Sequence, residues 1–190
     1  IHDKPMIYYP QSVLMLAGIR EESRYDPHSP YSASKASADH FVRAFYDTHK
    51  LPIIISNCSN NYGPNQHKEK LIPTVINSLI NKSKIPVYGN GLNVRDWLYV
   101  EDHVEAIDLI FHRGYVGETY CIGGNNEIRN LDLIKLIIKQ FDSIKKYKNS
   151  SIDLISFVKD RLGHDYRYAI DISKIKNELG WEPKTSIDIG

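Results

Sequence analysis

Three features that would identify common protein classes are missing from this sequence: long hydrophobic runs, a charge of one sign and clustered cysteines. No apolar run approaches the roughly 20 residues that cross a bilayer, so no membrane partner is expected. The formal net charge is +1 at pH 7, which gives no electrostatic reason to expect nucleic acid as a partner. The first 20 residues lack the basic start and uninterrupted apolar core of a signal peptide. We therefore expect a cytoplasmic protein.

Disulfide and metal chemistry also lack their usual patterns. Cys58 and Cys121 are the only cysteines, and each lies inside an apolar, strand-like stretch, which disfavours a disulfide framework and a cysteine zinc site. The eight His residues are scattered without the ligand spacing of a zinc site. We expect no metal.

Short apolar runs alternate with helically spaced apolar residues along the chain, which predicts an α/β architecture. "NNYGPNQ" is predicted to be a loop from its Asn, Gly and Pro content. Asn130 or Asp132 is expected to cap one helix, and Asp171 to cap the last one, which Gly180 ends. The predicted strands are "LPIIISNCS", "IPVYG", "RDWLYV", "ETYCI" and "SIDLISFV", and the predicted helices cover residues 31–49, 71–81, 101–114, 133–147 and 172–180.

Tyr31 and Lys35, in "SPYSASKASADHF", are a candidate acid/base pair. Residues four apart share a helix face, and an ammonium beside a phenol favours the phenolate. The surrounding small residues would let a ligand approach closely. A Tyr-x-x-x-Lys match arises about once by chance in a chain of this composition, and Tyr46 with Lys50 provides another. The spacing alone leaves a catalytic pair and a solvent-facing pair both open.

Several longer segments together resemble the extended short-chain dehydrogenase/reductases, and among them the dTDP-glucose 4,6-dehydratase family. They are "SPYSASKASADHFVRAF", "NCSNNYGPNQHKEKLIP", "PVYGNGLNVRDWLYVEDH", "YCIGGNNEIRNLDL", "DRLGHDYRYAID" and "ELGWEPKTS". The resemblance implies the C-terminal part of a Rossmann-like NAD-binding fold plus a small α/β substrate-binding domain. It also implies NAD-dependent dehydration of dTDP-glucose to dTDP-4-keto-6-deoxyglucose in deoxysugar biosynthesis. An NAD-dependent nucleotide-sugar epimerase or decarboxylase is the neighbouring alternative.

The resemblance implies roles for the residues that match the family's motifs. Tyr31 would be the base that takes the sugar 4-hydroxyl proton and would also contact NAD. Lys35 would bind the nicotinamide ribose and tune Tyr31, and Asn61 would lie near NAD. Tyr88 would lend an aromatic face to the base, and Arg95 would grip the diphosphate. The positions implied to bind the nucleotide sugar are Asn60, Lys70, Leu71, Pro86, Val87, Tyr88, Arg95, Asn130, Asp160, Arg161, Gly163 and His164.

Structural roles compete with several of these assignments. Tyr88 could pack at a strand edge, and Arg95 could form an ion pair with Asp96. Leu162 stands where the family usually has Pro, so the loop around it is expected to be less rigid. Tyr168 and Trp181 are predicted to be core residues.

The chain also departs from the family it resembles. The glycine-rich turn of a dinucleotide-binding sheet is missing, since Gly114 and Gly117 lack a third glycine at the needed spacing. A Thr-Asp-Glu motif expected before Tyr31 is missing as well. We expect residues 1–20 to be a leader that does not match the family and residues 21–190 to be a partial domain. This chain alone is then expected to be inactive, and the alternative is a non-catalytic remnant that binds sugar nucleotide weakly. The resemblance also implies a homodimer as a possible assembly.

Overall fold

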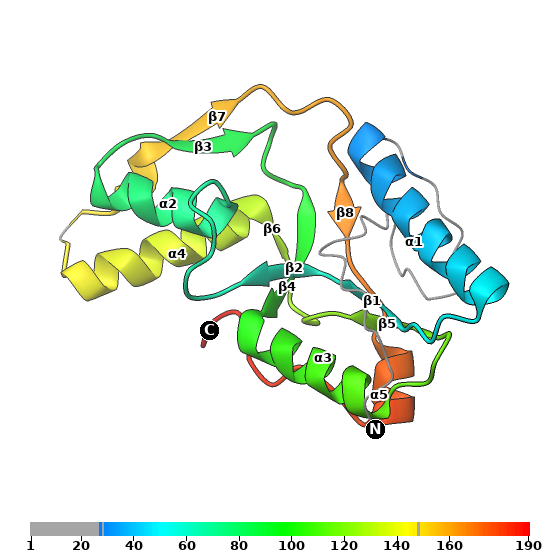
Figure 1. The fold of residues 1–190 in the computed structure, drawn as a ribbon. Helices are drawn as coiled ribbons and strands as arrows, with labels where there is room; N and C mark the ends of the chain where they lie inside the picture. The colour runs from blue at the N-terminus through cyan, green and yellow to red at the C-terminus, as the bar shows by residue number, and fades with distance from the viewer. Residues whose placement is uncertain (1–26, 28, 148) are drawn as a thin grey trace.

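Helices and strands alternate along the part of the chain that the computed structural model describes, residues 27, 29–147 and 149–190. The expected leader, residues 1–20, lies outside the described residues. The predicted α/β class is confirmed (Figure 1). The elements are α1 (Pro30–His49), β1 (Ile55–Cys58), β2 (Asn60–Tyr62), α2 (Leu71–Ile80), β3 (Ile85–Tyr88), β4 (Val94–Tyr99), α3 (Val100–Arg113), β5 (Thr119–Ile122), β6 (Glu127–Arg129), α4 (Asn130–Lys145), the 3-10 helix η1 (Ser151–Leu154), β7 (Ile155–Val158), β8 (Arg167–Tyr168) and α5 (Ser173–Leu179).

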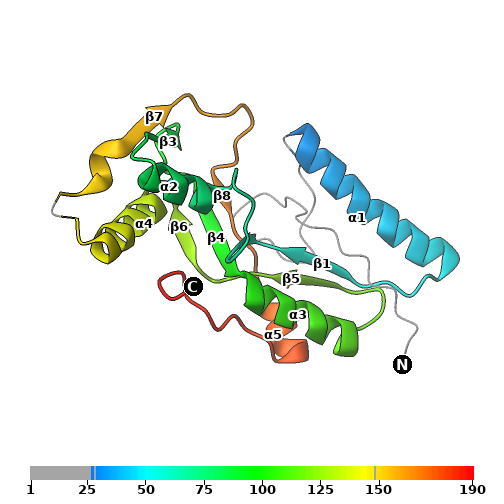
Figure 2. The same ribbon diagram turned by 60° about the vertical axis from the view of Figure 1, so that its left-hand side comes forward.

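Parallel pairing dominates the sheets of the described residues. β1 pairs with β5 and β3 pairs with β7, while β4 lies between β2 and β6 and also pairs with β8. Only the β4–β6 pair is antiparallel among these. In Figures 1 and 2 the β3–β7 pair lies at one end with α2 and α4, and the β1–β5 pair lies at the other end with α1, α3 and α5. β4 and β8 run between the two ends, so they bring both together.

The helix α1 begins where the sequence predicts. Ser29 is its N-cap and accepts the Ser32 N–H at 3.1 Å, and Pro30 follows at the first helical position, where a missing N–H does no harm. Val42 on its buried face packs with Ile53 and Ile55. This packing fixes the helix that carries Tyr31 against the β1 end of the molecule.

Strands β1 and β5 lie at the centre of the main core, and every residue of both is buried. Such burial is typical of parallel strands covered on both faces, and in β1 it includes the polar residues Ser56 and Asn57. The prediction that Trp181 is a core residue is confirmed. The buried cluster comprises Ile54, Cys58, Leu98, Ala106, Ile110, Tyr120, Ile122, Ile172, Ile175, Leu179 and Trp181.

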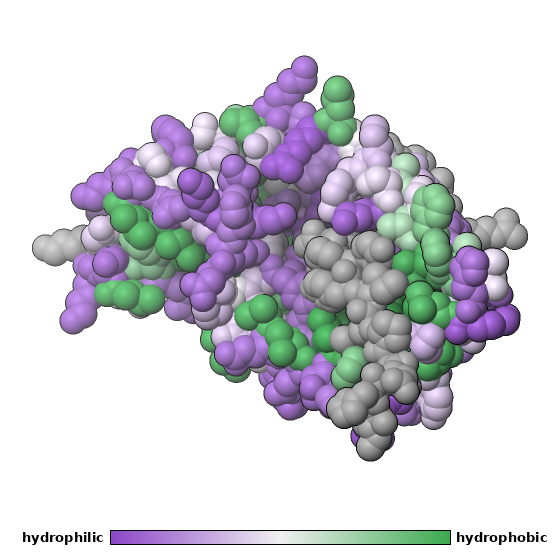
Figure 3. Space-filling view, viewed as in Figure 1, coloured by the Kyte–Doolittle hydropathy of each residue, from purple (hydrophilic) through white to green (hydrophobic). Residues whose placement is uncertain are grey.

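A second core joins α2 and α4 to β3. Val75 and Leu79 from α2 pack with Ile134 and Ile138 from α4 and with Ile85. Between the two helices an apolar groove reaches the C-terminal residues 187–190. Figure 3 shows hydrophobic side chains gathered over these helices, on the left of the view.

Three local predictions are wrong. Ser151–Leu154, the first half of the predicted strand "SIDLISFV", is the 3-10 helix η1, and only Ile155–Val158 is a strand. Asn60–Tyr62 is a strand, not a loop, because it pairs in parallel with Trp97–Tyr99, and this tertiary pairing overrides the low strand propensity of Asn. Neither Asn130 nor Asp132 caps α4: the N-cap is Arg129, without a side-chain bond, and Asn130 is the first helical residue.

Other boundaries follow the predictions closely. The N-cap of α5 is Ile172, one residue after the predicted Asp171, although the Asp171 carboxylate accepts the Ser173 N–H at 2.7 Å beside it. Gly180 ends that helix with a positive φ of 74°. No helix among the described residues has both the length and the apolar character to cross a membrane.

Candidate functional site

Two adjoining cavities lie where the two ends of the molecule meet. The first, here called the Tyr31 cavity, has a volume of about 430 Å³, and the second, the Tyr88 cavity, about 220 Å³. Four side chains line both: Asn60, Arg95, Arg161 and His164. The cavities are therefore two compartments of one site, bordered by α1 on one side and by α2 and β3 on the other.

Tyr31 lines the first compartment. Its position in the first turn of α1 leaves the side chain 53 % exposed while it lines the Tyr31 cavity. The Lys35 ammonium lies 5.7 Å from the centre of the Tyr31 ring. Tyr31 therefore lines the cavity, and Lys35 lies beside its ring on the same helix face.

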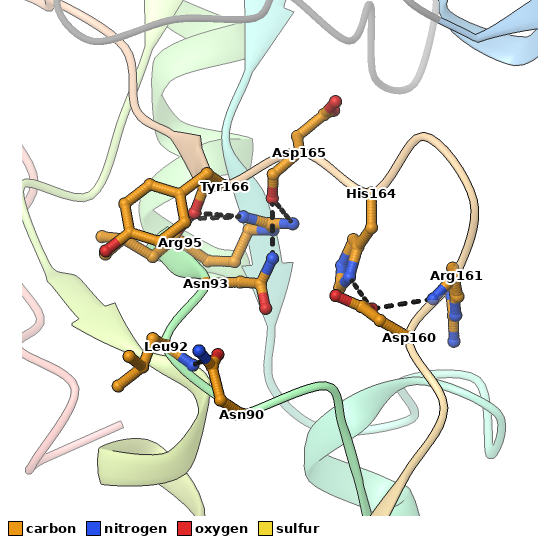
Figure 4. A network of polar contacts seen from close by, with 10 residues as sticks. Asn90, Leu92, Asn93, Arg95, Asp160, Arg161, His164, Asp165 and Tyr166 are labelled. Atoms are coloured by element: carbon orange, nitrogen blue, oxygen red, sulfur yellow. Dashed lines mark hydrogen bonds and ion pairs between the residues drawn. The ribbon is translucent and has the colours of Figure 1, made fainter.

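Arg95 places a positive charge between the two compartments (Figure 4). Its Nη2 donates to the Asp165 carbonyl at 2.7 Å, and its Nη1 donates to the carbonyls of Val94 at 2.7 Å and Tyr166 at 3.4 Å. Burial lowers the pKa of Arg95 and the Asp165 charge opposes this, but a guanidinium stays cationic at neutral pH. Since a guanidinium has five N–H donors, donors remain for an anion.

The alternative of an Arg95–Asp96 ion pair is wrong. Instead, the buried Asp96 carboxylate accepts the backbone N–H groups of Gly124 and Asn126, each at 2.8 Å. No ion pair joins Arg95 to Asp96 in the described part of the chain, and Asp96 points to the turn after β5.

The loop of residues 160–166 contributes Arg161, Leu162, Gly163, His164 and Asp165 to the cavity walls, and Figure 4 shows its polar contacts. The Asp160 carboxylate accepts the Arg161 N–H at 2.8 Å and lies 2.7 Å from His164 Nδ1. The His164 contact, with the Arg161 N–H, lowers the pKa of Asp160, which is an anion at neutral pH. Gly89 has a φ of +58°, and a Cβ there would lie 2.8 Å from an Asp160 carboxylate oxygen, so glycine lets this loop approach β3.

An aromatic face and a cation meet at the second compartment. Tyr88, at the end of β3, lines the Tyr88 cavity and is 37 % exposed. The Arg161 guanidinium carbon lies 4.4 Å from the centre of its ring. The Tyr88 ring therefore lies at the cavity, in contact with Arg161, and is not simply packed at the edge of a strand.

Buried amides line the same region without complete pairing. The Oδ1 atoms of Asn61 and Asn130 are buried and have no hydrogen-bond partner. Asn61 Nδ2 donates to the Ser59 carbonyl at 3.2 Å, and Gln66 Nε2 donates to the Asn61 carbonyl at 2.7 Å. A buried amide oxygen without a donor is a place where a ligand donor would be stabilising.

The structure assembles most of the positions predicted from the sequence. Val87 is an exception, since its side chain is buried in the α2–α4 core, and Lys35, Asn61 and Asp160 lie beside the cavities without lining them. The predicted residues that do line them are Tyr31, Asn60, Lys70, Leu71, Pro86, Tyr88, Arg95, Asn130, Arg161, Gly163 and His164.

Several other lining residues were not predicted to belong to the site. Thr74 follows Lys70 by four residues, so helical spacing could have placed it on the same face. Tyr168 is buried, as predicted for a core residue, but its ring also lines the Tyr31 cavity while its hydroxyl donates to the Cys58 carbonyl at 2.7 Å. The additional lining residues are Ser29, Ser32, Glu69, Thr74, Trp97, Leu162, Asp165 and Tyr168.

This α/β arrangement, with its parallel strand pairs, places the chain in the Rossmann-like class of dehydratases and epimerases. The chain belongs to the family described as GDP-mannose 4,6 dehydratase, whose model matches residues 14–190. A UDP-glucuronic acid 4-epimerase from Bacillus cereus shares the fold, with a TM-score of 0.86 at 24% identity over 98% of this chain and 58% of that one.

Relatives within the family confirm the resemblance found in the sequence. A probable dTDP-glucose 4,6-dehydratase of Sinorhizobium fredii is 52% identical over 90% of this chain and 49% of its own length. A dTDP-glucose 4,6-dehydratase of Escherichia coli is also 52% identical, over 90% of this chain and 48% of its own length. The chain therefore spans about half the length of the curated relatives it matches.

Solved structures agree. A Bacillus anthracis dTDP-glucose 4,6-dehydratase in complex with NAD superposes with a TM-score of 0.89 at 45% identity, over 98% of this chain and 58% of that one. A Streptomyces venezuelae dTDP-glucose 4,6-dehydratase with NAD and TYD bound superposes with a TM-score of 0.85 at 39% identity, over 93% of this chain and 53% of that one.

Proposed function

We propose that this chain provides the nucleotide-sugar site of an NAD-dependent dTDP-glucose 4,6-dehydratase, which acts in deoxysugar biosynthesis. The observation that carries the proposal is the shared wall of the two cavities, where Arg95 and Arg161 lie between an aromatic face at Tyr88 and the hydroxyl of Tyr31. A sugar nucleotide is an aromatic base, a dianionic diphosphate and a polar sugar in that order. The site offers complementary groups in the same order.

The Tyr88 cavity is the proposed base compartment. Tyr88 supplies a ring for stacking, Pro86 and Leu71 supply apolar walls, and Lys70 adds a positive charge at the rim. Asn130 Oδ1, buried and without a partner, is a suitable acceptor for a donor of the nucleotide. Arg95, between the compartments, is suited to the diphosphate because a guanidinium binds phosphate oxygens bidentately.

The Tyr31 cavity is the proposed sugar compartment. The Lys35 ammonium favours the phenolate form of Tyr31. The phenolate oxygen takes the proton of the sugar 4-hydroxyl as C4 is oxidised, and Tyr31 becomes a neutral phenol. Asn60 donates and accepts hydrogen bonds without adding charge, which suits a sugar hydroxyl.

The residues present fit one end of NAD. The buried, unpartnered Oδ1 of Asn61 and the Tyr31–Lys35 pair lie beside the cavity where the nicotinamide would meet the sugar. NAD, when bound there, supplies the hydride acceptor for oxidation at C4 and returns that hydride at C6. The 190-residue sequence has no glycine-rich turn for the pyrophosphate, so we propose that the chain on its own binds the sugar nucleotide without turnover.

The test is to incubate the purified chain with dTDP-glucose and NAD and to follow both binding and the 4-keto-6-deoxy product by mass spectrometry. We expect dTDP-glucose to protect the chain against thermal unfolding more strongly than UDP-glucose or GDP-mannose, with no product. Equal protection by all three would contradict the proposed nucleotide, and product from the chain alone would contradict the proposed lack of turnover.

Two further expectations stay proposals. A homodimer is supported by Phe41 and Phe45, which lie four residues apart on α1 with 66% and 52% of their surfaces exposed. The cytoplasm stays the expected compartment on the basis of cysteine usage.

A further inference from the structure

The guanidinium of Arg161 covers the ring face that a base would use. Its 4.4 Å distance to the Tyr88 ring centre is shorter than the 5.3–6.0 Å of the other cation–ring contacts among the described residues. Arg161 is exposed, so this position reflects attraction to the ring and not crowding. A base that stacks on this face of Tyr88 must first displace the guanidinium.

The main chain beneath Arg161 is held in place. Asp160 accepts the Arg161 N–H, contacts His164 Nδ1 and lies against Gly89. At the other end of the loop, Arg95 donates to the Asp165 carbonyl (Figure 4). Displacement therefore needs only rotation of the Arg161 side chain, without opening of the loop.

The Arg161 side chain lies next to both cavities. Arg161 lines both the Tyr88 cavity and the Tyr31 cavity, where the other guanidinium, that of Arg95, also lies. Two cations facing one space repel each other unless an anion lies between them. Stacking on Tyr88 separates them in the ligand-free protein, and a diphosphate would favour their approach.

We propose that Arg161 selects nucleoside diphosphates over unphosphorylated nucleosides, because it covers Tyr88 until a diphosphate draws its guanidinium away and the base stacks on the vacated ring. This inference rests on the nucleotide-sugar site proposed above. Arg161 would then hinder stacking of the base on Tyr88 and, at the same time, attract the diphosphate.

The test compares thymidine and dTDP as ligands of the unaltered chain and of Arg161→Ala, with dissociation constants from ligand-detected NMR titration. Loss of an exposed cation–ring contact should make thymidine bind about two- to fivefold more tightly to Arg161→Ala. Loss of a charged donor should make dTDP bind about tenfold more weakly. Lys145→Ala, which removes a cation 5.9 Å from the Phe141 ring outside both cavities, is the matched control and should change neither constant.

The opposite changes in the two constants are the decisive readout. If Arg161→Ala bound thymidine as the unaltered chain does but bound dTDP more weakly, Arg161 would bind only the anion, and the proposal would be overturned. Parallel weakening of both ligands would show a structural role and would also overturn it. If the unaltered chain bound no dTDP at all, the nucleotide site itself would be contradicted, which separates that failure from failure of the selection by Arg161.

Discussion

Replacement of Asp96 should destabilise the chain more than any single exposed substitution. Asp96 is 1 % exposed, and its two carboxylate oxygens accept the N–H groups of Gly124 and Asn126. The Asn126 side chain in turn donates to the carbonyls of Trp97 and Thr185. One carboxylate therefore holds β4 to the turn after β5 and, through Asn126, to the C-terminal segment.

The magnitude follows from these two bonds. A hydrogen bond to a charged group contributes about 1.5–3 kcal/mol, and a buried donor left without a partner is destabilising. Asp96→Ala removes both acceptors, so we expect the free energy of unfolding to fall by about 3–5 kcal/mol. Asp96→Asn keeps one acceptor oxygen and avoids burial of a charge, the effect that raises the pKa of Asp96, so its loss should be smaller, about 1–2 kcal/mol.

Urea unfolding followed by circular dichroism measures both losses. Asp47→Ala, at an exposed position of α1, is the matched control and should lie within about 0.5 kcal/mol of the unaltered chain. Because Asp96 neighbours Arg95 on β4, Asp96→Ala should also weaken dTDP-glucose binding. An Asp96→Ala chain within about 1 kcal/mol of the unaltered one would refute the reasoning.

Three other predictions concern stability and the roles within the site. Burial lowers the pKa of His103 from 6.5 to about 4. Between pH 6.5 and about pH 4, His103 therefore binds a proton in the unfolded chain but stays neutral in the folded chain. The free energy of unfolding should therefore fall by about 3 kcal/mol as the pH falls through that window; an identical pH slope in His103→Gln would contradict this. Ile175→Ala, at a residue with 0 % exposure, should lower the free energy of unfolding by about 2–5 kcal/mol in urea titrations, and a loss below about 1 kcal/mol would contradict its core position. Tyr31→Phe should bind dTDP-glucose within about twofold of the unaltered chain by calorimetry, because the hydroxyl is assigned to proton transfer; a larger loss would show that it binds the ground state.

Local patterns in the sequence predicted the helices and most strands, because their signals are short-range. Ser29 and Pro30 before α1, and Gly180 after α5, mark helix ends through backbone geometry alone. The strand at Asn60–Tyr62 could not be predicted this way, because only pairing with a distant strand makes it extended.

In the site, too, local features could be predicted from the sequence, and contacts between distant segments could not. The Tyr31–Lys35 spacing is visible in the sequence because both residues lie on one helix face. The contact between Tyr88 and Arg161, and the bonds from Arg95 to the loop, join segments whose proximity depends on the sheet order. Matching family motifs gathered these residues into one prediction, but only the structure shows that Arg161 and Tyr88 contact each other.

Calorimetric titration of the chain with dTDP-glucose tests the central claim most directly, which is that the two joined cavities form a nucleotide-sugar site around Arg95. We predict saturable binding of one dTDP-glucose per chain, weakened at least about tenfold in Arg95→Ala because a charged donor to the diphosphate is lost. Absence of binding to the unaltered chain, or equal binding to Arg95→Ala, would contradict the claim.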